Sequence, residues 1–410
     1  MSHTFSPRGG STASWSLDLG DARRHELFEF VQAKRQLLHR FPDLSGEEGP
    51  TLELIRRELL EMGHAEASLR MGEGLVLSIR GTKPGPRLVL RSPVDALPIV
   101  ERTGVPFSSD VPGRMHACGH DATSAVLLGM ARAMLQVQCD FAGELALFFQ
   151  GGEETLSGAR RALETDLLRL NEGDFLASFH LSPRLEVGQI GFPAQGLLFA
   201  GAACVRLKLS SRGGHVANAS STGNLIAELC PLLSKIESLA KVQERSAEGF
   251  SFSWGKLAAG TAWNVLPQTA EATGSLRYRD GAQVEAFRRA ALEALRDVHA
   301  PQVSAAIEVN VLTEPLVISS SANALLIDAL RPDHYRGVVG VTPSLAAEDA
   351  AVLFARAPGV YFLVGCSSGV QRKSLHADDF DFAPETTDFA LLACVDVCER
   401  FFSAGGLHVA

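Results

Sequence analysis

The sequence predicts an α/β protein with a mostly parallel sheet flanked by helices, into which a smaller α+β domain is inserted. Three observations support this fold class. Almost continuously apolar strand segments alternate with helical patterns, as is typical of parallel sheets covered on both faces. Near Gly201 the pattern changes to strand-helix-strand-strand-helix-strand, the order of ferredoxin-like domains. The length of 410 residues also exceeds one ordinary hydrophobic core, so two domains are expected.

The larger domain begins with two predicted amphipathic helices. The first follows Asp21, a residue that can cap a helix, and is ended by Pro42, which cannot continue one. The second ends at Gly63, because glycine readily adopts the left-handed conformation that terminates helices. The other elements expected here are strands at 75–79, 87–94, 144–150, 175–180 and 360–365 and helices at 121–137 and 384–402. We assign residues 21–200 and 313–405 to this discontinuous domain.

The inserted domain, residues 201–312, is predicted from the change in strand pattern. Residues 204–209 alternate between apolar and polar side chains, as half-buried strands do. Its other expected elements are helices at 222–241 and 282–298 and strands at 250–257, 270–278 and 304–312. Residues 1–20, which contain Ser, Thr, Gly and Pro, are expected to form a disordered tail.

The composition argues against several classes of partner. The formal net charge of −9 disfavours binding to nucleic acid or to an anionic membrane. No apolar stretch reaches membrane-spanning length, and residues 1–20 lack the basic start and apolar run of a signal peptide. Seven scattered cysteines, an odd number, indicate reduced thiols rather than a disulfide framework. A cytoplasmic protein that acts on a small molecule is therefore expected.

The segment His116-Ala117-Cys118-Gly119-His120-Asp121, just before a predicted helix, brings together several residues that can bind metal. Cys118 and His120 are two positions apart, so a turn can direct both side chains to one side, where they can bind one metal ion or bridge two. Gly119 permits a sharp or left-handed backbone between them. Taken alone, such a pair is more often structural, with the cysteine packed as a small hydrophobic residue.

Further acids and histidines follow the predicted strands at their carboxyl ends. Asp95 follows one strand, Glu153 and Glu154 follow another, His180 ends a third, and His376 lies in the loop before the last helix. Ligands of open parallel sheets gather at this end of the strands. Each residue also has an ordinary interpretation, since a Glu-Glu pair is usually a solvated helix start and a strand-end histidine is usually structural. Their joint occurrence nevertheless predicts a metal site.

The number of candidate ligands favours two ions rather than one. The five candidates are Cys118, His120, Glu154, His180 and His376. This is more than a single open tetrahedral zinc site needs, and two neighbouring ions could share a bridging thiolate. Glu153 is then left to act as a general base that transfers a proton from water to a leaving nitrogen. Asp95 is expected to accept the far N–H group of a ligating imidazole.

Short motifs along almost the whole chain after residue 20 resemble those of a known metallopeptidase family. The motifs are His39-Arg40-Phe41-Pro42-Asp43-Leu44-Ser45, Val94-Asp95-Ala96-Leu97-Pro98-Ile99, Met115-His116-Ala117-Cys118-Gly119-His120-Asp121, Phe149-Gln150-Gly151-Gly152-Glu153-Glu154, Gly213-Gly214-His215, Gly260-Thr261-Ala262-Trp263-Asn264-Val265-Leu266-Pro267, Glu348-Asp349 and Leu375-His376. In this order and spacing they resemble the amidohydrolase branch of the aminoacylases and carboxypeptidases, which includes hippurate hydrolases and hydrolases of auxin–amino acid conjugates.

The resemblance implies a catalytic domain with an inserted lid, two divalent metal ions, and hydrolysis of the amide bond of an N-acyl amino acid. It assigns metal binding to the five candidate ligands and the general base to Glu153. It also assigns substrate or transition-state contact to His215 and Asn264 and, more weakly, binding of the substrate carboxylate to Arg277. It further implies that lids pair as a two-fold homodimer in which His215 completes the partner's site.

Several alternatives remain open from the sequence. A dipeptidase or carboxypeptidase of the same family, or a non-catalytic metal-binding relative, could share these motifs, although a binding protein has no need of Glu153. The mixed ligands admit zinc or manganese first, and also cobalt or nickel. Gly151-Gly152 replaces the usual Pro-Ala of the family, and we expect this change to loosen the turn before Glu153. The sequence does not specify the acyl group, the amino acid or the native metal.

Overall fold

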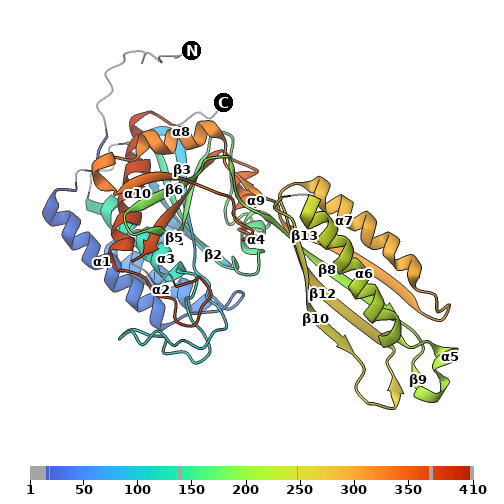
Figure 1. Ribbon diagram of the computed structural model, residues 1–410. Coiled ribbons are helices and arrows are strands. Elements are labelled where there is room, and N and C mark those ends of the chain that lie inside the picture. Colours follow the sequence, from blue (N-terminus) through green and yellow to red (C-terminus); the bar gives the residue numbers. More distant parts are fainter. Residues whose placement is uncertain (1–14, 18, 137–140, 247, 369–372, 407–410) are drawn as a thin grey trace, which may run out of the picture. The chain divides into compact units, whose positions relative to one another are not determined.

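The computed structural model describes residues 15–17, 19–136, 141–246, 248–368 and 373–406 (Figure 1). The chain divides into two compact units, each described by itself. Unit 1 comprises Met1–Phe192, Ser319–Gly340 and Arg356–Ala410, and unit 2 comprises Pro193–Ile318 and Val341–Ala355. Unit 1 is therefore discontinuous in sequence.

Unit 1 contains an eight-stranded sheet with the order β1-β2-β4-β3-β5-β16-β6-β15. Its strands are β1 (Leu69–Met71), β2 (Gly74–Arg80), β3 (Lys83–Pro93), β4 (Ala142–Gln150), β5 (Phe175–Glu186), β6 (Gln189–Pro193), β15 (Gly337–Val341) and β16 (Gly359–Ser367). The four neighbouring strands β4, β3, β5 and β16 run parallel. Antiparallel strands β2 and β6 extend this group on its two sides. The predicted α/β class with a mainly parallel central sheet is thus confirmed.

The parallel strands are buried along most of their length, as strands covered on both faces must be. All residues of β16 are buried, and so are the first eight of β5. The helices of this unit are α1 (Asp21–Arg40), α2 (Gly49–Met62), α3 (His120–Gln136), α4 (Gly158–Glu164), α8 (Ser320–Ala329) and α10 (Glu385–Ser403). Helix α3 packs closely on α1, because a Cβ atom at Gly129 would lie 2.5 Å from Val31 Cγ2. Glycine at this position therefore permits the close approach.

The ends of the first two helices differ in how well they were predicted. Asp21 is the first residue of α1 and not its cap, since Gly20 occupies the cap position. Gly63 ends α2 in the left-handed conformation, with φ 110°, as predicted. At the start of α2 the backbone N–H of Thr51 donates to Asp43 Oδ2 at 2.8 Å. The side chain of the residue before α2, Glu48, makes no capping hydrogen bond.

Unit 2 is dominated by a four-stranded antiparallel sheet with two long helices packed on it (Figure 1). Its main elements are β8 (Gly201–Ser210), α6 (Leu225–Ser246), β10 (Ser251–Ala259), β12 (Thr269–Tyr278), α7 (Gly281–Ala294) and β13 (Ser304–Thr313). The strand order is β10-β12-β8-β13, which is the arrangement of the split βαββαβ unit. Helix α6 begins at Leu225, three residues later than expected, because Ala219–Thr222 forms the separate short helix α5.

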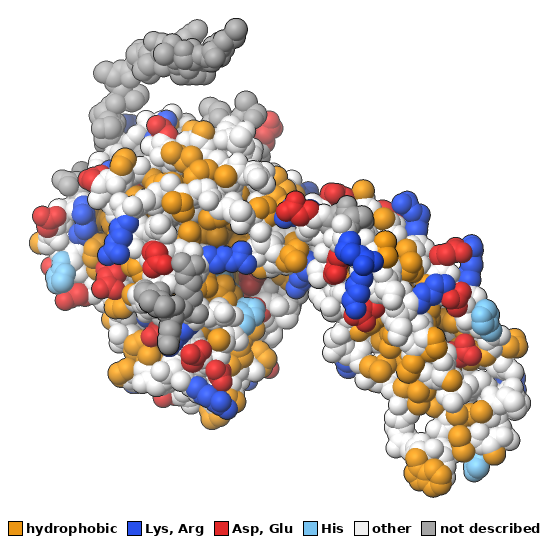
Figure 2. Space-filling view, in the orientation of Figure 1, with side chains coloured by type: hydrophobic (Ala, Val, Ile, Leu, Met, Phe, Trp, Pro, Cys, Tyr) orange, Lys and Arg blue, Asp and Glu red, His pale blue; other side chains and the backbone are white. Residues whose placement is uncertain are grey.

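Unit 2 exposes apolar side chains at several places on its surface, including the end that carries β9 (Gly214–His215) (Figure 2). Trp263 is 92% exposed and Val265, in β11 (Val265–Leu266), is 50% exposed. Leu257 of β10 is 56% exposed, and β10 lies at one edge of the four-stranded sheet. An exposed edge strand of this kind offers unpaired backbone groups to a partner.

The segment before α1 is partly packed. Leu17 is buried, and its N–H donates to Glu399 Oε1 of α10 at 2.7 Å. The Trp15 ring contacts Phe402 with ring centroids 5.5 Å apart. The predicted disordered tail of residues 1–20 is therefore wrong for these residues, whereas residues 1–14 and 18 lie outside the described part of the chain. None of the helices in the described residues combines the length and apolar character needed to cross a membrane.

Candidate metal centre

The loop before α3 presents the first two candidate ligands. Gly119 has a φ of +83°, and a Cβ atom there would lie 2.8 Å from Leu181 Cδ1. Only glycine fits this left-handed and crowded position without strain. Cys118 and His120, the first residue of α3, flank this glycine, and they contact His180 of β5 and the Asp95 carbonyl oxygen after β3. Both side chains are buried.

Two histidines from distant segments converge on the thiol. The Cys118 sulfur lies 3.3 Å from His180 Nε2 of β5 and 3.3 Å from His376 Nε2. His180 Nδ1 lies 2.8 Å from the Leu181 carbonyl oxygen, to which it can donate, so Nε2 is left for a metal ion. The described structure therefore brings together one thiol and two imidazoles with nitrogen atoms directed at the sulfur.

His376 has an unusual backbone conformation, with φ 65°. Non-glycine residues in this region cost about 1–3 kcal/mol and cluster at functional sites. The conformation is held by a hydrogen bond from the His376 N–H to the Ala117 carbonyl oxygen at 2.8 Å. The loop that carries His376 is thereby fastened to the loop that carries Cys118.

Glu154 completes the set of predicted ligands. Its Oε2 lies 3.5 Å from His376 Nε2. In the described part of the chain, the buried atoms Glu154 Oε1 and His120 Nε2 have no hydrogen-bond partner. Buried polar atoms are rarely left unsatisfied, so two such atoms of ligand type among these side chains fit a site for bound cations. Thiolate, imidazole and carboxylate together suit zinc and related divalent ions.

Within the described residues of unit 1, three overlapping groups of side chains have ligand atoms within 4.8 Å of one another. The groups are Cys118 with His120 and His180, Cys118 with Glu154 and His376, and His120 with Glu153 and Glu154. Since the groups share members, all five predicted ligands and Glu153 belong to one cluster. Glu153 is buried, with its Oε2 3.8 Å from His120 Nε2.

Asp95 approaches the His120 ring most closely with its backbone carbonyl oxygen and not, as expected, with its carboxylate. The Asp95 backbone carbonyl oxygen is 2.8 Å from His120 Nδ1, whereas its carboxylate Oδ1 is 3.5 Å away. The carbonyl is therefore the closer acceptor for the far nitrogen of the ring. The carboxylate Oδ2 instead accepts hydrogen bonds from the Ser45 hydroxyl at 2.6 Å and from the Glu154 N–H at 2.8 Å.

The cluster is electrostatically suited to a cation. Burial lowers the pKa of His120, but the hydrogen bond to Asp95 and the charge of Glu154 outweigh burial and raise the pKa to about 9. Burial raises the pKa of Asp95, but its contacts with His120 and Ser45 hold the pKa below its ordinary value. The surrounding carboxylates thus favour positive charge at the centre of the cluster, and divalent ions would supply it.

The predicted lid residues lie in unit 2, and only two of them are neighbours. His215 in β9 is exposed and pairs with Val265 of β11, and the Val216 N–H donates to the Asn264 carbonyl oxygen at 3.2 Å. Arg277 pairs with Ala202 near the opposite end of β12. Eight strand residues from Thr269 to Arg277 correspond to about 27 Å. The structure therefore separates Arg277 from the other two residues.

Several residues around the cluster carried no predicted role. His39 Nδ1 lies 2.8 Å from Asp121 Oδ2, and the Arg35 guanidinium contacts the same carboxylate at 3.4 Å. Burial raises the pKa of Asp121, but His39 and Arg35 outweigh it and hold the pKa well below its usual range. Ser45 and Glu48 also contact the loops of the site. His39 and Ser45 lie in one of the motifs quoted above, which was the available signal for them.

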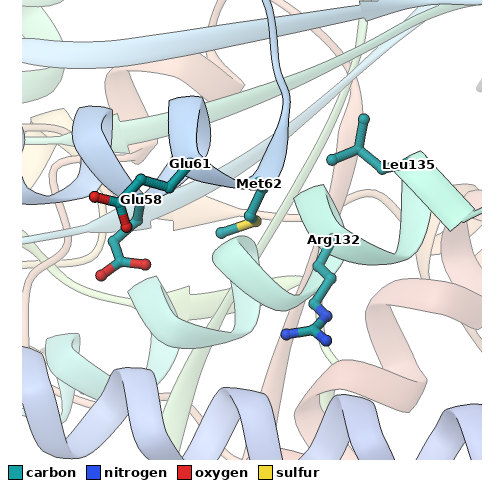
Figure 3. A pocket seen from close by; sticks show the side chains of 5 residues that line it. All are labelled: Glu58, Glu61, Met62, Arg132 and Leu135. Carbon is teal, nitrogen blue, oxygen red and sulfur yellow. The ribbon is translucent and has the colours of Figure 1, made fainter.

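A surface pocket of unit 1 can be distinguished from this cluster. It lies beside the C-terminal parts of α2 and α3 and is lined by Glu58, Glu61, Met62, Arg132 and Leu135 (Figure 3). Arg132 follows His120 by twelve residues of helix, which corresponds to about 18 Å. The pocket contains none of the predicted ligands.

A cluster of thiol, imidazole and carboxylate side chains of this kind is typical of metal-dependent hydrolases. The sequence profile of Peptidase family M20/M25/M40 matches residues 89–402, and the chain belongs to this family. It is accordingly a hydrolase of amide C–N bonds, and the resemblance inferred from the motifs is confirmed.

Known proteins of similar sequence and structure agree with this assignment. N-acetyl-L-cysteine deacetylase of Bacillus subtilis (strain 168) is 29% identical over 332 residues, covering 81% of this chain and 79% of the relative. N-acetyldiaminopimelate deacetylase of Geobacillus thermodenitrificans (strain NG80-2) is 26% identical over 341 residues, covering 83% and 89%. A crystal structure of a dinuclear metal binding peptidase of the M20 family from Bacillus subtilis matches with a TM-score of 0.72 at 26% identity, covering 92% of this chain and 99% of that one.

Proposed function

We propose that the chain hydrolyses the amide bond of an N-acyl amino acid in a reaction that depends on two divalent metal ions. The convergence of all five ligand-type side chains and Glu153 in one cluster is the observation that supports this most directly. Two relatives are deacetylases of N-acetylated amino acids, and a structural relative is a dinuclear metal binding peptidase. These similarities favour a small N-acyl amino acid as the substrate.

Each residue of the cluster has a proposed task. Cys118, His120, Glu154, His180 and His376 would hold the ions. When bound, the ions would polarise the amide carbonyl and make water a better nucleophile at neutral pH. Glu153 takes a proton from the attacking water and delivers it to the leaving nitrogen. The carbonyl oxygens of Asp95 and Leu181 fix the rings of His120 and His180 so that each Nε2 is available to a metal.

The nature of the metal and the location of the protein are further parts of the proposal. Zinc or manganese is proposed first, because both accept mixed sulfur, nitrogen and oxygen ligands, and cobalt or nickel would also fit. A cytoplasmic location is supported by the cysteines, since Cys204, Cys230, Cys366, Cys394 and Cys398 are free thiols.

A substrate panel tests the proposed activity. We expect metal-reconstituted protein to hydrolyse N-acetyl amino acids with a higher kcat/KM than dipeptides that carry the same C-terminal amino acid. Release of the free amino acid gives the rate for both series. Faster cleavage of the dipeptides would favour a dipeptidase or carboxypeptidase, and no cleavage of either series would favour a non-catalytic metal-binding protein.

We also propose that unit 2 mediates a two-fold homodimer and that His215 completes the site of the partner chain. The support lies in unit 2 itself, where His215 is exposed beside exposed apolar side chains and the edge strand β10 is uncovered. Asn264, whose backbone contacts the residue after His215, would reach the same partner site. We propose in addition that Arg277 binds the substrate carboxylate.

Mixing two inactive variants tests the exchange of His215. Homodimers of His215→Ala and of Glu153→Gln should each be nearly inactive. In a mixed dimer, the chain that keeps Glu153 receives His215 from its partner. Random exchange makes half of the dimers mixed, and each has one of two sites intact, so about a quarter of wild-type activity should return. Unchanged low activity after exchange would contradict the proposal.

A double variant gives the matched control. Wild type mixed with an equal amount of the His215→Ala, Glu153→Gln double variant should fall from half to about a quarter of full activity on subunit exchange, because every mixed dimer is inactive. If His215 acts within its own chain, the activity stays at half.

A further inference from the structure

Glu153 lies between two backbone N–H groups that are both held by acidic side chains. The Gly152 N–H, on one side, donates to Glu48 Oε1 at 2.7 Å. The Glu154 N–H, on the other side, donates to Asp95 Oδ2 at 2.8 Å. Hydrogen bonds to ionised carboxylates are stronger than those between neutral groups, so they hold the backbone of Glu153 on both sides.

The two carboxylates are connected through one short segment, residues 45–48. The Ser45 hydroxyl donates to Asp95 Oδ2 at 2.6 Å, and the Gly46 N–H donates to Glu48 Oε2 at 2.8 Å. Glu48 therefore accepts from its own loop with one oxygen and from the loop of Glu153 with the other. The segment joins Asp95 and Gly152, whose loops follow different strands of the sheet.

Glu48 occupies the capping position of α2, but its side chain does not cap this helix. Glu48 immediately precedes α2, where an acidic side chain ordinarily accepts hydrogen bonds from the first turn. Here the first turn is served by Asp43, and the Glu48 side chain, only 6% exposed, is directed to Gly152 instead. Burial holds the pKa of Glu48 above its ordinary value, although the N–H groups of Gly46 and Gly152 act in the opposite direction by stabilising the carboxylate.

The glycine pair before Glu153 makes this contact possible. Gly152 has a φ of +72°, a left-handed conformation that favours glycine. A Cβ atom at Gly151 would lie 2.6 Å from the Glu73 carbonyl oxygen and 3.1 Å from the Glu48 carboxyl carbon. The glycines therefore permit a turn in which the Gly152 N–H reaches the Glu48 carboxylate.

We propose that Glu48 is a positioning residue for Glu153, holding the turn that carries the general base at a fixed place beside the metal ligands. This inference rests on the proposed function, in which Glu153 transfers the proton. Glu48 does not contact the reacting atoms and acts through the Gly152 peptide.

The test compares the same chemical change at two adjacent residues. In Glu48→Gln, an amide NH₂ group replaces one acceptor oxygen and faces a backbone N–H, so one of the two hydrogen bonds is lost. We expect kcat to fall roughly ten- to a hundredfold, because small displacements of a catalytic group are costly, while KM and metal content remain those of wild type. Glu47→Gln is the control, since Glu47 is 57% exposed and pairs with Arg114. It should match wild type.

A second measurement does not depend on activity. Hydrogen exchange of a peptide covering residues 150–156 in metal-free protein should be faster in Glu48→Gln than in Glu47→Gln. Glu48→Asp retains the charge but is one methylene shorter and cannot span both N–H groups, so it should show the same two effects more weakly. This variant also decides the question if Glu48→Gln does not fold.

The proposal is overturned if Glu48→Asp and Glu48→Gln match Glu47→Gln in kcat and exchange, or if their loss of activity follows a loss of metal. If instead the proposed function is wrong, the activity assay and the exchange experiment give different answers. In that case wild type hydrolyses no N-acyl amino acid, whereas the exchange experiment still reports whether Glu48 holds Gly152.

Discussion

Replacement of Glu153 by glutamine is expected to lower kcat by roughly 10²–10⁴-fold. Glutamine preserves the shape of the side chain, but its amide cannot accept a proton from water at neutral pH. The buried carboxylate lies with Oε2 3.8 Å from His120 Nε2, so it is placed beside the ligands. Steady-state kinetics with the best N-acetyl amino acid from the panel, together with metal analysis, would measure the effect. KM and metal content should stay near those of wild type.

Glu154→Gln provides the matched control for this experiment, because it makes the same change at the neighbouring residue. It should lose metal, since Glu154 is the proposed ligand and its Oε2 lies 3.5 Å from His376 Nε2. If Glu153→Gln loses metal and Glu154→Gln retains it, the roles of the two glutamates have been assigned in the wrong order.

Removal of the metal ions is expected to abolish hydrolysis. The ions supply the activation of water that no described side chain replaces, so chelated protein should be inactive. Titration of metal-free protein with zinc or manganese should restore activity as about two ions bind per chain. Elemental analysis alongside the rate measurement would check the stoichiometry. Recovery at a single ion per chain would contradict the two-ion site.

Cys118→Ala tests the proposed bridging thiolate in the same assay. The sulfur lies 3.3 Å from both His180 Nε2 and His376 Nε2, so its loss should lower metal occupancy and activity together. Cys394→Ala is the control, because Cys394 is a buried thiol of α10 outside the cluster. Full activity of Cys118→Ala with unchanged metal content would exclude the bridging role.

The fold was largely accessible from the sequence because its long elements have strong periodicity. The strands that became β4 and β5 were expected to within a few residues, except that β5 continues beyond His180 to Glu186. The short strands β1, β6 and β15 were not expected. Each has five residues or fewer, too few for a pattern to emerge, and their pairing depends on the neighbouring strand rather than on their own residues.

The cluster of metal ligands could be predicted because cysteine, histidine and glutamate bind metal ions and because the sequence places several of them after predicted strands. Cys118, Glu154 and His180 are examples that the structure brings together. The supporting contacts could not be anticipated in the same way. The hydrogen bonds from the Gly152 N–H to Glu48 and from the Ser45 hydroxyl to Asp95 depend on the paths of two loops, which residue types alone do not specify. The separation of Arg277 from His215 likewise follows from strand register.

The place of β16 in the sheet has a consequence for biosynthesis. β16 lies between β5 and β6, which precede unit 2 in the chain, whereas β16 follows it. While a ribosome translates unit 2, an interval of roughly 10–30 s at ordinary elongation rates, the facing edges of β5 and β6 lack their partner strand. The four-stranded sheet of unit 2 uses only Gly201–Thr313, so it can finish pairing first. The nascent protein therefore passes through a stage with an open sheet, at which chaperone binding would protect it most from edge-to-edge aggregation.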